Sequence, residues 1–281
     1  MTITARSRLR LLFLFFSVLI FSFAVFSYVF SQVISSYSKL PENLSNLAAG
    51  TSSFFSYNPL SVAMVVLLFS LVSFVFIVYV HFAFRKIQST EMFFFEVFLF
   101  SISFESLRLL IPLYSFSSFI LVELSAISRL LYFFRFLGIF SLLAMSLFSI
   151  KVVTRQIFPI TFLIFFLSLI LSMSSPMDGT YINPLFMAGK LYLRRHIILF
   201  FSCSLFLILS MIISYFYNGI RERLYMIVSM ICLLIGYFVL LYAQSYFTLL
   251  LSGLLFAAGV FSTVKNIHSI YLWQWKMQPK L

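Results

Sequence analysis

The sequence predicts an all-α protein of the polytopic integral membrane class, a helical bundle with about eight transmembrane helices. Of the 281 residues, 63% are hydrophobic and 20% aromatic, whereas a typical soluble domain is about 45–50% apolar. Only 9% are charged, where about 25% is usual. The apolar residues form long continuous runs, with short basic clusters between them. This composition excludes a soluble enzyme, a disordered tail, a nucleic-acid-binding domain and a disulfide scaffold.

The apolar runs set the predicted spans, because a hydrocarbon core about 30 Å thick needs about 20 apolar helical residues. Continuous runs favour helices over barrel strands, which are about ten residues of alternating polarity. Residues 1–281 are expected to be a single transmembrane domain without a soluble domain. The predicted spans are 10–33, 60–83, 92–112, 119–149, 157–174, 196–217, 224–243 and 246–264.

Two of these spans carry alternatives. The apolar run after Arg10 is longer than the 7–15 residues of a signal-peptide core, so it is expected to be an uncleaved first span. The fourth predicted span, 119–149, would extend about 46 Å as one helix. Either it is strongly tilted, or residues up to Ser128 form a separate interfacial turn.

The distribution of Lys and Arg predicts the orientation, since these residues are enriched on the cytoplasmic side. With eight spans, side two holds Lys39, Lys190, Arg194 and Arg195, and both termini fall on side one. We therefore expect an inner or plasma membrane protein with both termini in the cytoplasm. Side one holds Arg6, Arg8, Arg10, Arg85, Lys86, Lys151, Arg155, Arg221, Arg223, Lys265, Lys276 and Lys280.

Charged residues inside the third and fourth spans are the strongest functional candidates, because each costs about 2.5–3.5 kcal/mol to insert. Antiparallel helices allow three pairs at equal depth, Arg108 with Glu123, Glu105 with Arg129 and Glu96 with Arg135. Glu96 lies 180° around the helix from Glu105, so one face cannot hold all three pairs. We expect Glu105, Arg108, Glu123 and Arg129 to form one network in the outer half. Glu96 and Arg135 would then face other helices, or each other across a different seam.

Two interpretations of this network stay open. Buried ion pairs often only fix which helices pair and in what register. Alternatively, the network is a polar pocket that recognises a ligand or passes an ion or proton, and an arginine pair suits a carboxylate or phosphate group.

The second external loop, 175–195, contains turn signals at Asp178–Gly179 and Asn183–Pro184. The stretch 184–192 is expected to form a short interfacial helix. Lys190, Arg194 and Arg195 are candidates for contacts with lipid phosphates or with the loop, which could cover the outer pocket.

The sequence contains few motifs typical of catalysis or metal binding. His81, His196 and His268 lie far apart without metal-ligand spacing, and no nucleophile or phosphate-loop motif occurs, so neither a metal nor a cofactor is expected. Cys203 and Cys232 lie in apolar stretches and are interpreted as core residues. The last span carries small residues typical of close helix packing, namely Ser252, Gly253, Ala257, Ala258 and Gly259.

Both tryptophans lie in the segment 271–276, just past the last predicted span. Tryptophan and tyrosine favour the membrane interface, so this segment is interpreted as an anchor or as a docking site for a cytoplasmic partner protein. The other expected partner is the lipid bilayer, and nucleic acid is not expected.

Three functions are compatible with the sequence. The first is a membrane-embedded sensor or accessory subunit acting through a partner, which fits the short loops and the basic aromatic tail. The second is a small-solute or ion transporter with its polar path between the third and fourth spans. The third is a lipid-modifying membrane enzyme, for which only Asp178, His196 and the nearby arginines offer reactive groups.

Overall fold

The computed structural model describes residues 3–35, 58–84, 89–111, 121–149, 157–175, 182–183, 185–188, 193–218 and 221–277. Within these ranges the chain forms eight α-helices, one 3₁₀ helix and a two-stranded antiparallel hairpin. The all-α class is thus confirmed. The elements are α1 (Ile3–Ser35), α3 (Pro59–Ala83), α4 (Thr90–Ser103), η1 (Phe104–Leu109), α6 (Leu121–Phe148), α7 (Ile157–Met173), β1 (Ile182–Asn183), β2 (Met187–Ala188), α8 (Leu193–Asn218), α9 (Arg221–Leu241) and α10 (Tyr246–Met277).

Six of the described helices, α1, α3, α6, α8, α9 and α10, are long and apolar enough to cross a membrane. The apolar helix α7 has 17 residues, and α4 has 14 before it tightens into η1. Each predicted span therefore coincides with helical structure, and the third consists of α4 followed by η1.

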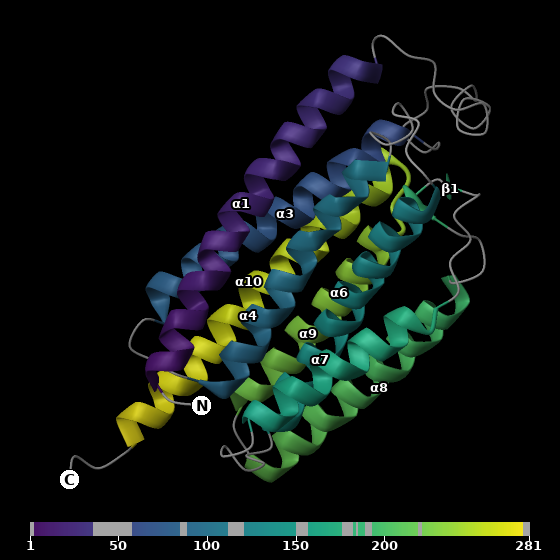
Figure 1. The fold of residues 1–281 in the computed structure, drawn as a ribbon. Helices are drawn as coiled ribbons and strands as arrows, with labels where there is room; N and C mark the ends of the chain where they lie inside the picture. Colours follow the sequence, from purple (N-terminus) through teal and green to yellow (C-terminus); the bar gives the residue numbers. More distant parts are fainter. Residues whose placement is uncertain are drawn as a thin grey trace.

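The helices run side by side in one elongated bundle (Figure 1). The start of α1 and the end of α10 lie at the same end, here called the terminal end, and the hairpin of β1 and β2 lies at the opposite, hairpin end (Figure 1).

Local sequence sets where two helices begin. The Asn58 side chain accepts a hydrogen bond from the Leu60 amide at 2.9 Å, and Pro59 follows at the first helical position. Ser89 caps α4 in the same way through the Met92 amide. The Asn58 amide donates to the Gln244 carbonyl at 2.9 Å, which ties the start of α3 to the turn between α9 and α10.

Helix α4 lies in the centre of the bundle, with every residue except Phe100 buried. Helix α1 runs along one edge of the molecule (Figure 1), and its Phe15, Phe26 and Val29 are exposed. Helices α9 and α10 pack closely, because a Cβ on Gly259 would lie 2.6 Å from the Leu233 Cα. The small residues of the last span thus serve close packing within the chain, as the sequence predicts.

Three boundary predictions need correction. Helix α6 is continuous from Leu121, so the alternative of a separate turn up to Ser128 is wrong. Helix α10 continues to Met277, well past residue 264, because its apolar face persists and Ile267 and Ile270 are buried.

The predicted interfacial helix over 184–192 is also wrong, because Ile182 pairs with Ala188 and Asn183 with Met187 in a hairpin. Phe186 has a φ of 56°, the left-handed conformation that closes three-residue hairpin loops. Leu185, Phe186 and Met187 are buried, so the loop packs into the bundle as a tight hairpin in place of the expected helix.

Candidate functional site: buried charge clusters

Glu105 and Arg108 of η1 and Arg135 of α6 form a buried polar site, here called the Glu105 cluster. Arg135 binds the carboxylate through two hydrogen bonds, from Nε to Oε1 at 2.6 Å and from Nη2 to Oε2 at 2.8 Å. Arg108 also contacts this carboxylate, with its Nη1 3.4 Å from the Glu105 Oε2. None of the three side chains is more than 3% exposed.

The 3₁₀ form of η1 explains why Glu105 and Arg108 act together. Residues three apart lie directly above one another in a 3₁₀ helix, whereas in an α-helix they are offset. Short 3₁₀ stretches next to α-helices are also common at functional hinges. The change from α4 to η1 therefore places the Arg108 guanidinium beside the Glu105 carboxylate.

Arg108 connects the Glu105 cluster to the hairpin. Its Nε and Nη2 donate to the Leu185 carbonyl at 2.9 and 2.7 Å. This carbonyl lies in the loop held by the left-handed Phe186. The hairpin is thus attached to the charged core of the bundle by a fully buried guanidinium.

Aromatic rings and a histidine surround the Glu105 cluster. The Arg135 guanidinium carbon lies 5.6 Å from the centre of the Tyr132 ring, a cation–π contact. The His196 Nδ1 lies 3.1 Å from the Tyr242 hydroxyl, and the His196 Nε2 is buried without a hydrogen-bond partner. His196 also contacts Tyr132, with ring centres 5.7 Å apart.

The charges of the Glu105 cluster do not cancel. It contains two guanidinium groups and one carboxylate, so its formal charge is +1. The neutral Leu185 carbonyl accepts the hydrogen bonds of Arg108. A buried positive charge of this kind can hold an anionic group, or can make the position of the hairpin sensitive to nearby charge.

A second ion pair lies toward the terminal end. Arg10 of α1 lies with its Nε 2.9 Å from the Glu96 Oε1 and donates from Nη1 to the Phe84 carbonyl at 3.0 Å. Glu96 thus faces α1 and Glu105 faces α6, as their 180° separation predicts.

A third cluster joins Glu91 at the start of α4 to Arg223 at the start of α9, with the Arg223 Nη2 3.8 Å from the Glu91 Oε1. Arg223 also donates to the Ser149 hydroxyl and, at 2.8 Å, to the Ser214 hydroxyl. Sequence reasoning missed this cluster, because Arg223 follows a helix boundary and was assigned to the cytoplasmic charges. The one available signal was Glu91, an acid directly before an apolar run.

One predicted pairing is wrong, because Glu105 bonds Arg135 in place of Arg129 and Arg135 therefore belongs to the Glu105 cluster. Glu96 faces another helix, which is one of its two expected alternatives, and bonds Arg10 of α1. Close contacts set the register of α4 and η1 against α6: Phe104 stacks on Phe134 at 3.6 Å. The partner of Glu105 therefore lies six residues further along α6 than charge matching predicts.

Of the remaining predicted site residues, Arg129 is the one whose side chain the structure describes. Arg129 is partly buried, with its Nε lacking a hydrogen-bond partner, and its carbonyl accepts from Ser172. Glu123, Arg194 and Arg195 lie in α6 and α8, but their side chains fall outside the described residues. Lys190 and the tail after Met277 lie outside the described residues altogether, as do the side chains of Trp273 and Trp275.

Within the described parts of the chain, no three His, Cys, Asp or Glu side chains come together in a way that could hold a metal ion. Comparison with known proteins finds no match for this chain among family models, curated proteins or solved structures. The fold nevertheless defines the class: the chain is a multi-pass membrane protein whose helices contact the lipid bilayer. Any more specific function has to be argued from its buried charges.

Proposed function

We propose that the protein is a membrane-embedded sensor or accessory subunit that catalyses no reaction and acts through a partner protein. In this proposal the hairpin end responds to a ligand or to the state of the bilayer, and the terminal end passes the response to the partner. The excess of Lys and Arg near the terminal end favours its placement in the cytoplasm.

One observation carries the proposal: the segment formed by α4 and η1 pairs with a different helix at each of its three buried carboxylates. Glu91 pairs with α9, Glu96 with α1 and Glu105 with α6. Because a broken buried pair costs several kcal/mol, a shift of this central segment at one end alters the energy of contacts at the other.

The interior between the charge clusters supports a sensor over a transporter. Phe98, Leu99 and Ile102 lie between Glu96 and Glu105, and each is at most 2% exposed. A transport path would need polar or water-filled space along this segment. In the part of the chain that the structure describes, that position holds these packed apolar side chains and two serines, Ser101 and Ser103, whose hydroxyls donate to carbonyls of α4 itself.

The partner can be tested by brief chemical cross-linking in the cell's own membrane, followed by purification and quantitative mass spectrometry. The full chain is compared with a chain ending after Tyr271, which keeps the buried Ile267 and Ile270, and with a control ending after Met277. We expect one protein in stoichiometric amount with the full chain and the control, and its loss from the shorter chain.

A transport assay supplies the opposing result. The purified full chain is reconstituted in lipid vesicles, and fluxes of protons, sodium and anions are recorded. Flux above that of empty vesicles that disappears in Glu105→Gln would contradict the sensor proposal and establish a transporter.

A further inference from the structure

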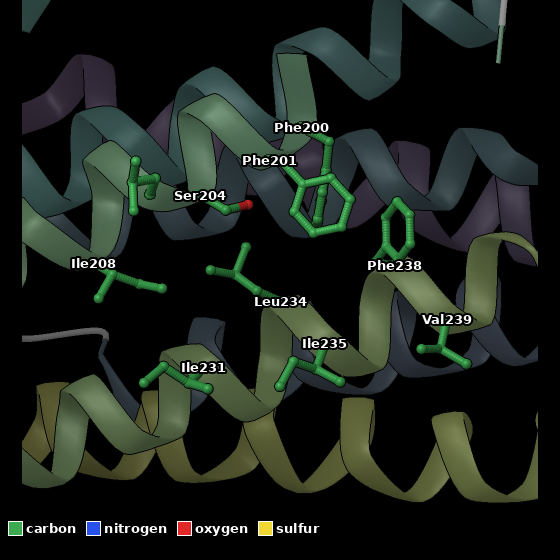
Figure 2. Close-up of a pocket in the computed structure, with 10 residues that line it drawn as sticks. Phe200, Phe201, Ser204, Ile208, Ile231, Leu234, Ile235, Phe238 and Val239 are labelled. Atoms are coloured by element: carbon green, nitrogen blue, oxygen red, sulfur yellow. The ribbon is translucent and has the colours of Figure 1, made fainter. Parts of the chain in front are cut away.

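A cavity of about 410 Å³ lies between α8 and α9, and apolar side chains form its lining except at Ser204. We call it the α8–α9 groove. Figure 2 shows Phe201 and Phe238 toward one end, Ile208 and Ile231 toward the other, and Ser204 between them.

The α8–α9 groove opens to the outside of the bundle. Phe201, Leu205 and Ile235 line it, and each is more than half exposed. In a membrane these side chains face lipid, so a molecule enters the groove sideways from the bilayer. Its volume lies within the range of about 300–1,000 Å³ found for small-molecule sites, which are mostly apolar with a few placed polar groups.

Ser204 supplies the polar group. It is 9% exposed, and its hydroxyl is buried without a hydrogen-bond partner. Some buried helical serines, such as Ser141 and Ser168, donate to the carbonyl four residues before them. Ser204 does not, and Ser70 and Ser210 are unpaired in the same way. Figure 2 shows the Ser204 oxygen directed toward the aromatic end of the groove. An unpaired hydroxyl in apolar surroundings is costly, and a ligand oxygen in the groove removes that cost.

The volume of the groove favours a small molecule over a whole partner helix as its occupant. A helix about 10 Å across fills on the order of 400 Å³ in a single turn, so the groove could take one turn only. A ring with a narrow tail fits the elongated arrangement better. The two phenylalanines at one end offer faces for stacking, and the isoleucines at the other end offer an aliphatic channel.

We propose that the α8–α9 groove binds a membrane-soluble ring compound that has a carbonyl oxygen and an apolar tail. The Ser204 hydroxyl donates a hydrogen bond to the carbonyl oxygen. The ring lies against Phe201 and Phe238, and the tail runs past Ile208 and Ile231. This site is separate from the Glu105 cluster and does not depend on the proposed sensor function.

The test uses the full chain in detergent micelles, titrated with 2-decyl-1,4-benzoquinone and followed by native mass spectrometry. The matched ligand is decylbenzene, which has the ring and tail without the oxygens. We expect a saturable one-to-one complex with the quinone and at least fivefold weaker binding of decylbenzene. Ser204→Ala should weaken quinone binding about fivefold, the value of one hydrogen bond.

Two further variants separate filling of the groove from general damage. Ser204→Phe fills the groove and should abolish quinone binding. Ser202→Phe adds the same ring to α8 at a serine that does not line the groove and whose hydroxyl donates to the Leu199 carbonyl. It should bind as the unmodified chain does. If Ser204→Phe does not fold, the proposal is still tested by quinone binding to Ser204→Ala and by the comparison of quinone with decylbenzene.

Absence of a saturable quinone complex overturns the proposal. Equal binding of quinone and decylbenzene, or unchanged quinone binding in Ser204→Ala, overturns the assignment of a carbonyl ligand to Ser204.

Discussion

Arg135 on α6 binds both carboxylate oxygens of Glu105 on η1, through hydrogen bonds of 2.6 and 2.8 Å. Such two-pronged pairs are the strongest arginine–carboxylate contacts, and they fix the relative position of two helices. Because both side chains are buried, loss of either one leaves an uncompensated charge in the core.

Neutralising Glu105 should therefore be severe. We expect Glu105→Gln to lower the free energy of unfolding by about 3–5 kcal/mol, measured by denaturation in mixed micelles. The double variant Glu105→Gln with Arg135→Gln should lose less than the sum of the single changes. Glu222→Gln, at a partly exposed acid of α9, is the control and should change stability by less than about 0.5 kcal/mol. Additive single and double effects would show that the pair is not coupled.

The hairpin loop gives a second prediction. Phe186 has a positive φ of 56°, which costs an ordinary residue about 1–2 kcal/mol relative to glycine. Both Phe186→Ala and Phe186→Gly lose the buried ring, but the glycine variant is free of the backbone cost. We expect Phe186→Gly to melt at a higher temperature than Phe186→Ala. The reverse order would contradict the left-handed assignment.

The contact between α9 and α10 gives a third. A Cβ on Gly259 would lie 2.6 Å from the Leu233 Cα, a backbone atom that cannot move alone. We expect Gly259→Ala to destabilise the chain by about 1–3 kcal/mol in thermal unfolding. Gly253→Ala is the matched control, because its Cβ would meet only the end of the flexible Leu68 side chain. Equal effects at the two glycines would contradict the close backbone contact.

Orientation can be measured by cysteine labelling. In a chain with Cys203→Ser and Cys232→Ser, single cysteines are placed by Lys190→Cys and by Lys276→Cys. The Lys and Arg distribution predicts that a membrane-impermeant maleimide labels the cysteine at position 190 in intact cells. The cysteine at position 276 should be labelled only after the membrane is opened. The opposite pattern would invert the predicted orientation.

The sequence predicted the helices well and their charge pairing poorly. Span length depends on local hydrophobicity, so the starts of α3 and α9 fall within a few residues of the predicted 60 and 224. The Glu105 partner depends on the register between α4 and α6, which is set by contacts such as Phe104 with Phe134 and the approach of Gly138 to Ser101. No local pattern reports such contacts.

The missed residues show the same limit. Arg10 and Arg223 were counted only as topological charges, although each reaches a buried carboxylate of α4. The sequence offers His196 only as a possible metal ligand or catalytic group, yet it lies between Tyr132 and Tyr242 beside the Glu105 cluster. These roles depend on which helices are neighbours, and that arrangement emerges only from the packed bundle.

The proposed sensor function requires coupling between the two ends of the bundle through α4 and η1. The most direct measurement is the distance distribution between spin labels at Arg8→Cys on α1 and Tyr225→Cys on α9, both exposed, in a chain with Cys203→Ser and Cys232→Ser. We predict that Glu105→Gln at the hairpin end shifts or broadens this distribution at the terminal end, while Glu222→Gln leaves it unchanged. An unchanged distribution in folded Glu105→Gln would contradict the coupling.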